Sequence, residues 1–312
     1  MSTGMFDAFA RIVGHDAVAA KVPLAPLTTF GVGGPADWLI DVRSVDALAA
    51  VLEIARAQGL PVAVLGGGSN VLVADTGVRG VVLRVRLTGV SLVDPSHVRA
   101  EAGLTMNGLV RWTIGRGLAG LEAWAGTPGT VGGAIHGNAH YGGVDIGTLV
   151  EQVALLSPSG EWREVPSAEM GFGYDTSRLF DTHEIVVWAD FHVRDGEPDA
   201  LRAVARASLA HRKNTQPLNL PSAGCVFQNP QHGIDHVPDG IPWSAGALID
   251  RAGLKGTREG GATVSPLHGN FIVTDGTATA RDIYTLIERA RATVQAQFGV
   301  TLRNEIVYLG DF

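Results

Sequence analysis

Apolar side chains recur at helical spacing in several parts of the chain. In residues 44–58, one face holds Val45, Leu48, Leu52 and Ala55, and Ser44 is placed to cap the first turn. Similar patterns predict helices over 105–116, 198–213, 244–252 and 280–298. In the last of these, Thr279 and Asp282 have the spacing of a capping box.

Short apolar runs between these helices predict β-strands. We expect strands over 62–65, 81–85, 90–93, 98–102, near 149–156, 185–193 and 300–309. Strands and helices do not alternate strictly, and no repeat of 20–50 residues is present. The pattern therefore predicts an α+β protein with two or three lobes.

Charge and cysteine content limit the possible functions. The 24 Lys and Arg against 31 Asp and Glu give a net charge of −7, which argues against a nucleic-acid partner. A single cysteine forms no intrachain disulfide, which favours a reducing compartment. The N-terminus does not resemble a signal peptide, and no apolar run approaches the roughly 20 residues of a membrane span. We expect a cytoplasmic protein.

Glycine is the unusual component, with 41 residues gathered mainly in three clusters. These are TFGVGG (29–34), LGGGSN (65–70) and GTPGTVGGAIHGNAHYGG (126–143). Backbone N–H groups in such turns form concave anion sites. Neither a P-loop nor a dinucleotide fingerprint is complete, and each cluster alone is equally well explained as a tight turn. The last two clusters together favour a nucleotide whose pyrophosphate they flank.

The cysteine, Cys225, lies in the polar stretch PSAGCVFQNP (221–230). A cysteine in this position is either a small buried apolar residue or a chemically active thiol. The residue types alone leave both possibilities open.

The ordered set of motifs resembles the UDP-N-acetylenolpyruvoylglucosamine reductase family, shorter subclass, over about residues 22–310. The motifs are LTTFGVGGPAD, PVAVLGGGSNVLV, AGTPGTVGGAIHGNA, FGYDTS, HRKNTQP, PSAGCVFQNP, SAGALIDRAGLKG, HGNFIV and NEIVYLG. The resemblance implies an α+β fold with an FAD-binding unit of the vanillyl-alcohol-oxidase type. The expected division is 1–84 with 300–312, then 85–211, for two FAD-binding subdomains, and 212–299 for an α/β substrate-binding domain.

The resemblance also implies an activity. It is the NADPH-dependent reduction, through non-covalently bound FAD, of the enolpyruvyl ether of UDP-N-acetylglucosamine to UDP-N-acetylmuramate, a peptidoglycan precursor. The expected partners are therefore the UDP-sugar and NADPH, with no nucleic acid, no membrane and no metal, and we expect a monomer. The expected FAD-binding residues are Gly66, Gly67, Gly68, Ser69, Asn70, Thr127, Gly129, Thr130, Gly132, Gly133 and Asn138.

Two catalytic groups follow from the resemblance. Cys225 replaces the serine that the family uses as proton donor, and a thiol gives up a proton more readily than an alcohol. Glu305 matches the near-terminal glutamate of the family, expected beside the developing enolate. Without the motifs, Glu305 is equally an ordinary residue of a final strand.

The arginine of the family is missing. Asp175 stands where that arginine follows the tyrosine, and Arg178 lies three residues later. In a helical turn Arg178 could serve the same carboxylate, whereas in an extended segment it points away. Arg178 is our third catalytic candidate, and a surface arginine beside two aspartates is the alternative.

Four further residues match family positions near the substrate: Lys213, Asn229, Tyr174 and Asn270. Gln228 replaces a lysine of the family, so one phosphate contact is expected to be lost. Each amide could instead form an ordinary turn, and Lys213 could be a solvated helix end. His136 and His140 are expected to be loop residues rather than covalent flavin links.

Two competing functions remain possible. One is an FAD oxidase or dehydrogenase that acts on a sugar or lactone, which shares the glycine clusters but not the motifs at 212–230 and 244–256. The other is a non-catalytic flavin- or nucleotide-binding descendant, suggested by Asp175.

Overall fold

The computed structural model describes residues 3–312, in two compact units. Unit 1 contains the chain up to Val22, Ala36–Gly67 and Arg79–His211. Unit 2 contains Pro23–Pro35, Gly68–Val78 and Arg212–Phe312. The division expected from the sequence has the same boundary near residue 211, but it assigns 300–312 to the N-terminal part.

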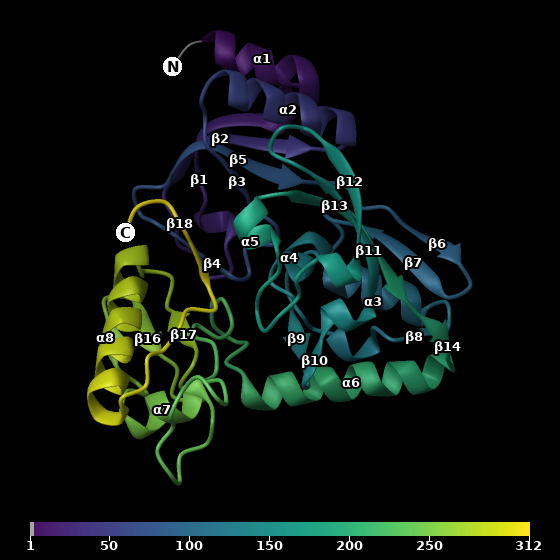
Figure 1. Cartoon of the computed structure of the whole chain (residues 1–312). Coiled ribbons are helices and arrows are strands. Elements are labelled where there is room, and N and C mark those ends of the chain that lie inside the picture. The colour runs from purple at the N-terminus through teal and green to yellow at the C-terminus, as the bar shows by residue number, and fades with distance from the viewer. Residues whose placement is uncertain (1–2) are drawn as a thin grey trace. The chain divides into compact units, whose positions relative to one another are not determined.

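The first layer of unit 1 is a four-stranded sheet covered by two helices (Figure 1). Its strand order is β1 (Val18–Pro23), β2 (Pro35–Val42), β5 (Val78–Val85) and β3 (Val62–Val64). The helices are α1 (Thr3–Val13) and α2 (Val45–Ala57). Their apolar faces bury Phe9 and Leu48 against Trp38 and Ile40 of β2. The Ser44 hydroxyl accepts a hydrogen bond from Ala47 N, which confirms the expected cap.

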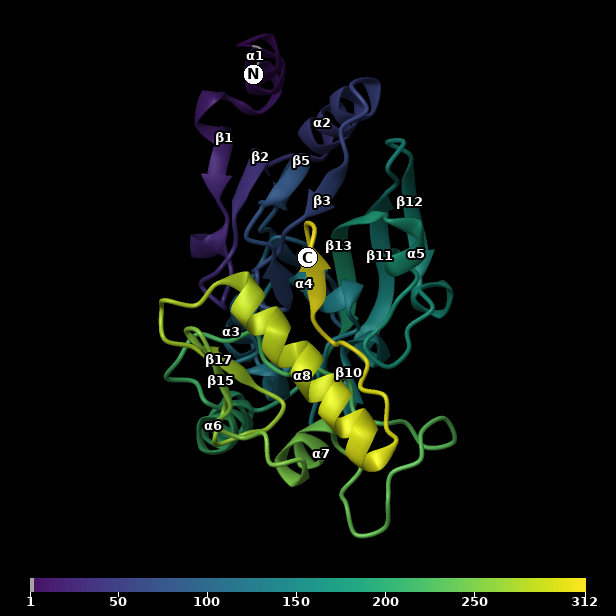
Figure 2. The same cartoon turned by 90° about the vertical axis from the view of Figure 1, so that its left-hand side faces the viewer.

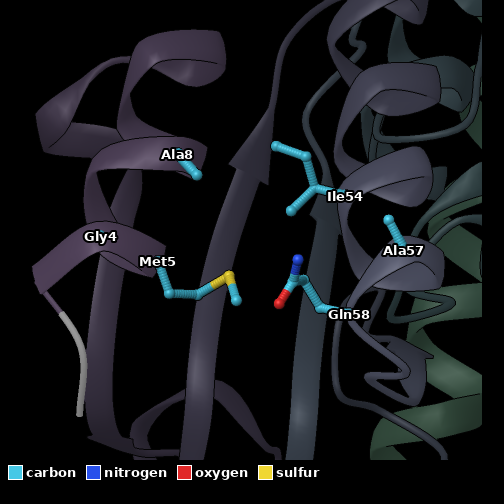
Figure 3. A pocket seen from close by; sticks show the side chains of 6 residues that line it. All are labelled: Gly4, Met5, Ala8, Ile54, Ala57 and Gln58. Carbon is cyan, nitrogen blue, oxygen red and sulfur yellow. The ribbon is translucent and has the colours of Figure 1, made fainter.

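A hollow of about 340 Å³ lies between α1 and α2 (Figure 3). Gly4, Met5 and Ala8 line it from α1, and Ile54, Ala57 and Gln58 line it from the other side. None of these six residues has an ionisable side chain, so they offer no side-chain acid or base.

The second layer of unit 1 is a five-stranded antiparallel sheet. Its order is β12 (Trp162–Pro166), β11 (Val150–Leu156), β13 (Ile185–His192), β7 (His97–Glu101) and β6 (Val90–Asp94). One face packs on α3 (Met106–Ile114) and α4 (Val131–His136), with Met106, Leu109 and Ile135 fully buried. The long helix α6 (Pro198–Thr215) comes after this sheet in the chain (Figure 1), and its residues Leu201 and Ala205 are buried in the same core.

Smaller elements complete unit 1. They are β8 (Leu118–Ala119) with β14 (Arg194–Asp195), β9 (His140–Tyr141) with β10 (Val144–Asp145), and α5 (Leu179–Thr182).

Unit 2 is built around α8 (Ala280–Phe298), which buries Ile283, Leu286 and Ile287 (Figure 2). It packs on a small antiparallel sheet of β15 (Arg258–Glu259), β16 (Ala262–Val264) and β17 (Ile272–Thr274), and on α7 (Ala245–Arg251). The predicted capping box is confirmed, because the Thr279 and Asp282 side chains each accept from the other residue's backbone N–H.

The final strand is shorter than expected. Only Val307–Leu309 forms a strand, β18, which pairs in parallel with β4 (Val71–Val73). The expectation was wrong for 300–306. There, the apolar pattern arises because Val300, Leu302 and Ile306 are buried in the core around α8, not because the segment belongs to a sheet.

Within residues 3–312, no helix combines the length and apolar character needed to cross a membrane.

Candidate active site

Cys225 lies on a short extended segment at the edge of the small sheet of unit 2. It forms an isolated antiparallel bridge with Phe271, and Val226 N donates to Asn270 O at 2.9 Å. The neighbours Ala223, Val226 and Phe227 are buried, whereas Cys225 is half-buried. The apolar neighbours therefore anchor the segment, and the thiol is left at the surface of the core.

The carboxamide of Asn270 fixes this segment from the other side. Phe227 N donates to Asn270 Oδ1 at 3.0 Å, and Asn270 Nδ2 donates to Phe227 O at 2.7 Å. Asn270 is 2 % exposed, so both hydrogen bonds are shielded from water. Asn270 was predicted to contact the substrate. Its side chain instead holds the backbone of Phe227, two residues after Cys225.

Glu305 is joined to the same segment through its backbone. Glu305 N donates to Val226 O at 2.8 Å, and Phe227 and Asn304 form an isolated bridge. Glu305 O in turn accepts from Asn70 Nδ2 at 3.0 Å. The two predicted catalytic residues, 80 positions apart, therefore lie on neighbouring backbone segments of one unit.

A cavity of about 310 Å³ opens beside the thiol. It is lined by Cys225, Asn229, Ser244, Gly246, Ala247, Asp250, Lys255, Leu267, His268, Gly269 and Asn270. Asn229 Oδ1 accepts from Ala245 N at 3.0 Å, so this predicted substrate ligand also fixes the start of α7. Three of the four predicted substrate residues lie in unit 2, and two of them, Asn229 and Asn270, line this cavity.

The cavity contains an imidazole that the sequence analysis did not select. Burial, with Lys255 nearby, lowers the pKa of His268 below its usual value. Its Nδ1 accepts from Asn270 N at 3.2 Å, which fixes a neutral tautomer with the proton on Nε2. The cation that lines the cavity is Lys255, whose Nζ donates to Asp250 Oδ2 at 2.8 Å.

The signal for this group was present in the sequence. His268 belongs to HGNFIV and Lys255 to RAGLKG, both of which support the resemblance. Neither residue has a catalytic spacing of its own, and only the fold of unit 2 brings both to the Cys225 cavity.

In unit 1, two glycine turns abut without side chains between them. A Cβ at Gly67 would lie 2.6 Å from Gly129 Cα, and one at Gly66 would lie 2.8 Å from Thr130 Oγ1. Any larger residue at 67 would push the turns apart. The predicted FAD-binding residues Gly66, Gly67, Gly129 and Thr130 are thus brought together.

The second of these turns presents backbone donors. Val131 N and Gly132 N donate to Leu104 O and Ala102 O, and Gly133 N donates to the Thr130 hydroxyl that caps α4. Among the described residues, no acceptor takes the N–H of Gly129 or Thr130. Gly129 and Thr130 are half-exposed and lie beside a surface without side chains. Their two N–H groups are therefore suited to bind a diphosphate.

The remaining predicted FAD residues occupy several places. Gly68 has a positive φ of 64°, and a Cβ there would overlap Leu27 O within unit 2. Ser69 and Asn70 follow it in the same unit. Asn138 is 2 % exposed and bridges two backbones, donating to Gly173 O and accepting from Gly147 N. Its side chain supports the loop around residue 173.

The segment with the missing arginine is a tight turn, neither helical nor extended. Gly173 and Thr176 exchange backbone hydrogen bonds, and Asp175 has a φ of 54°. Asp175 Oδ1 lies 2.9 Å from His140 Nδ1, and the Tyr174 ring lies 5.3 Å from the same imidazole. The aspartate is therefore paired with a histidine of β9. The expectation that His136 and His140 are loop residues was wrong, because His136 ends α4 and His140 begins β9.

Arg178 is engaged elsewhere. Its Nε lies 3.1 Å from Glu184 Oε2, and that carboxylate side chain is 5 % exposed. This ion pair competes with the predicted role at the substrate carboxylate. Lys213, by contrast, is exposed on the last turn of α6.

Comparison with known proteins identifies the family. Residues 36–166 match an FAD binding domain, and 216–309 match the C-terminal domain of UDP-N-acetylenolpyruvoylglucosamine reductase. A reductase of this name, numbered 2, from Symbiobacterium thermophilum is 41 % identical over 92 % of this chain and 91 % of its own. The chain belongs to the UDP-N-acetylenolpyruvoylglucosamine reductase family.

Other members agree. The reductase of Bacillus velezensis is 37 % identical over 94 % of both chains. The crystal structure of the reductase from Thermus caldophilus has a TM-score of 0.78 and 34 % identity over 93 % of this chain and 98 % of its own. The predicted family, the α+β class and an FAD binding domain are confirmed. The roles of individual residues stay predictions.

Proposed function

We propose that this protein reduces UDP-N-acetyl-3-O-(1-carboxyvinyl)-glucosamine to UDP-N-acetylmuramate, with NADPH as reductant and FAD as cofactor. The observation that carries the proposal is the backbone pairing of the Cys225 and Glu305 segments in a chain of this family. The reaction needs a proton donor and a group that stabilises the developing negative charge, and the Cys225 thiol and the Glu305 carboxyl group lie on adjacent segments.

When bound, FAD would supply hydride for the terminal carbon of the enolpyruvyl group. Negative charge then develops on the adjacent carbon and its carboxylate. The Cys225 thiol donates a proton from Sγ to that adjacent carbon, which completes the saturated lactyl ether. Glu305 lies on the paired segment, where a protonated carboxyl group would stabilise the developing charge.

The apolar anchor of Cys225 and the neutral His268 support the acid role. Thiols have an ordinary pKa near 8.5, so the protonated form dominates at neutral pH. No cation of the His268 ring offsets this preference, because burial lowers the pKa of that group.

For the UDP-sugar, we propose Asn229 in the Cys225 cavity and Lys213 as a mobile cation for phosphate. We keep Tyr174 as a candidate contact from its tight turn. Asn270 would act indirectly, since its amide holds Phe227.

For FAD, we propose the abutting turns of unit 1, Gly66–Gly67 and Gly129–Gly133 with Thr127, together with Gly68, Ser69 and Asn70. Asn138 would act by supporting the turn at Gly173. We further propose a cytoplasmic monomer that serves peptidoglycan precursor synthesis, and hence cell shape and division.

The test separates the two half-reactions. The purified protein is examined for a flavin spectrum, and NADPH oxidation is followed with and without the enolpyruvyl sugar nucleotide. We expect substrate-dependent NADPH oxidation and a product that has gained two hydrogen atoms, detected by mass spectrometry. Rapid NADPH oxidation with oxygen consumption and no sugar requirement would contradict the proposal and favour an oxidase.

The non-catalytic alternative makes a different prediction. It is favoured by one observation, the pairing of Asp175 with His140 where the family has an arginine. Normal flavin reduction by NADPH, followed by no reduction of the sugar nucleotide, would support it.

A further inference from the structure

Three potential metal ligands lie together on the five-stranded sheet of unit 1, and the reaction proposed above uses none of them. They are His97 on β7, His192 on β13 and Glu151 on β11, which are adjacent strands. One ligand atom from each lies within 4.8 Å of the other two. The sequence contains no motif for them, because 54 and 41 positions separate successive members.

The strand register explains the grouping. His97 and His192 are direct partners in the β7–β13 pair, so their side chains leave the same face of the sheet. Glu151 lies at an irregularity of the β11–β13 pair, between the partnered residues Val150 and Gln152. A bulge of this kind re-aims a side chain, here toward His192.

Close polar contacts fix the orientation of each imidazole. His97 Nδ1 lies 2.9 Å from the Asp94 carboxylate, and His97 Nε2 lies 2.9 Å from His192 Nδ1. His192 Nε2 lies 2.7 Å from Glu151 Oε2. His192 is therefore held between the other two proposed ligands.

Asp94 is itself held in place. Its Oδ1 accepts from Ser96 N at 2.7 Å and from the Ser96 hydroxyl at 2.8 Å. A carboxylate that orients a histidine through Nδ1 is the usual second-shell partner of a metal-bound imidazole. The cluster therefore joins two carboxylates to two imidazole rings, a set of groups that favours a cation.

We propose that His97, His192 and Glu151 bind one divalent transition-metal ion, with Zn²⁺ as the first probe, and that Asp94 orients His97. Two imidazole nitrogens and a carboxylate oxygen form a common donor set for Zn²⁺. With bonds of about 2.0–2.1 Å, tetrahedral ligand atoms lie about 3.3 Å apart, so side chains whose ligand atoms now lie within 4.8 Å of one another must rotate to close on the ion. An imidazole nitrogen binds the ion through its lone pair, so any proton on that nitrogen is released to solvent.

The ion would join three strands at the solvent-facing side of the sheet. The side chains of His192 and Glu151 are 47 % and 56 % exposed, so an ion can enter and a water molecule can complete its coordination. The expected consequence is stabilisation of unit 1 by the bound ion.

The test is calorimetric titration of the flavin-loaded protein with ZnCl₂. We expect one Zn²⁺ per chain, a loss of binding in His97→Ala and His192→Ala, and an affinity about 10–100-fold weaker in Asp94→Ala. His15→Ala, which removes an exposed imidazole elsewhere in unit 1, is the matched control and should bind as the wild type does. Flavin content and the melting temperature without metal verify that each variant is folded.

Two further outcomes are decisive. The stoichiometry should persist in Cys225→Ala, because the thiol and His268 form a different cavity. Zn²⁺ should raise the melting temperature of the wild type but not of the His97→Ala/His192→Ala double variant. Absence of a saturable site in the wild type, or an unchanged site in the double variant, would overturn the proposal.

Discussion

At the scale of single residues, the family resemblance predicts two departures at positions expected to take part in the reaction. Cys225 stands where the resemblance places a serine, and Asp175, which pairs with His140, stands where it places an arginine. Hydrogen bonds of the Asn270 side chain and of the Gly173–Thr176 turn hold the backbone beside these two residues. Substitutions at these positions therefore test chemistry separately from folding.

Cys225→Ala should leave flavin reduction by NADPH unchanged and slow the oxidation of the reduced flavin by the sugar nucleotide by about 10²-fold or more. Cys225→Ser should retain partial activity, since an alcohol is a weaker acid in the same position. Stopped-flow absorbance of the flavin measures both half-reactions. Equal rates in Cys225→Ala and wild type would remove Cys225 from the mechanism.

Arg178 has two possible roles that a paired substitution separates. Arg178→Ala leaves the buried Glu184 carboxylate without its ion partner, so we expect a loss of about 1–3 kcal/mol in unfolding free energy, measured by urea denaturation. Arg178→Ala/Glu184→Gln removes that charge and should recover most of the stability. If turnover also recovers in the double variant, Arg178 does not act on the substrate.

At the scale of elements, sequence patterns predicted what depends on local spacing. The Ser44 cap, the Thr279–Asp282 capping box and the apolar stripe of α8 agree with the structure because each is decided within two turns. The patterns missed β2 and extended the final strand over 300–306, since tertiary contacts decide strand pairing. The pairing of Glu305 with Val226 likewise joins distant segments, and only the family resemblance indicated it.

The Asn270 side chain clamps the Phe227 backbone through two hydrogen bonds, and one substitution removes both. In Asn270→Ala, the N–H and C=O of Phe227 lose buried partners, which should cost about 2–4 kcal/mol in unfolding free energy. The freed 225–229 segment should also slow the sugar-dependent half-reaction. Asn214→Ala, at an exposed position of α6, deletes the same group and should change the free energy by less than about 0.5 kcal/mol. Equal stability of the two variants would show that the clamp is unimportant.

The abutting glycine turns allow a similar test. Gly67→Ala places a Cβ against Gly129 and should cost about 1–3 kcal/mol while lowering the flavin content of the purified protein. Gly4→Ala, where a Cβ meets no atom within 4 Å, is the control and should keep full flavin. Flavin absorbance relative to protein concentration gives the occupancy. Full occupancy in Gly67→Ala would contradict the assignment of this turn to the cofactor.

At the scale of the whole molecule, the residues predicted to be functional are divided between the two compact units. Unit 1 contains most of the matched FAD binding domain and most of the glycine turns, and unit 2 contains Cys225, Glu305 and the cavity. The chain crosses between the units several times, so neither unit is a continuous piece of sequence. Composition and periodicity could not predict this, because both describe neighbours along the chain.

Each unit also contains a half-buried histidine, which links stability to pH. Burial lowers the pKa of His136 in unit 1, with His183 nearby, and the pKa of His268 in unit 2, with Lys255 nearby. Below the ordinary histidine pKa of about 6.5, the unfolded chain binds protons that these folded side chains do not. The unfolding free energy should therefore be constant above about pH 6.5 and fall as the pH drops below it.

This dependence is measured as the melting temperature between pH 7.5 and pH 5, because aspartates titrate at lower pH. His268→Asn keeps an acceptor for Asn270 N and removes one titrating group, so its loss of stability on acidification should be smaller than that of the wild type. His136→Asn should reduce the dependence in the same way, and the double variant should reduce it further. His15→Asn, at an exposed site, should follow the wild-type profile. If the melting temperatures of the wild type and the double variant fell in parallel with pH, burial of His136 and His268 would not contribute to the acid sensitivity of the fold.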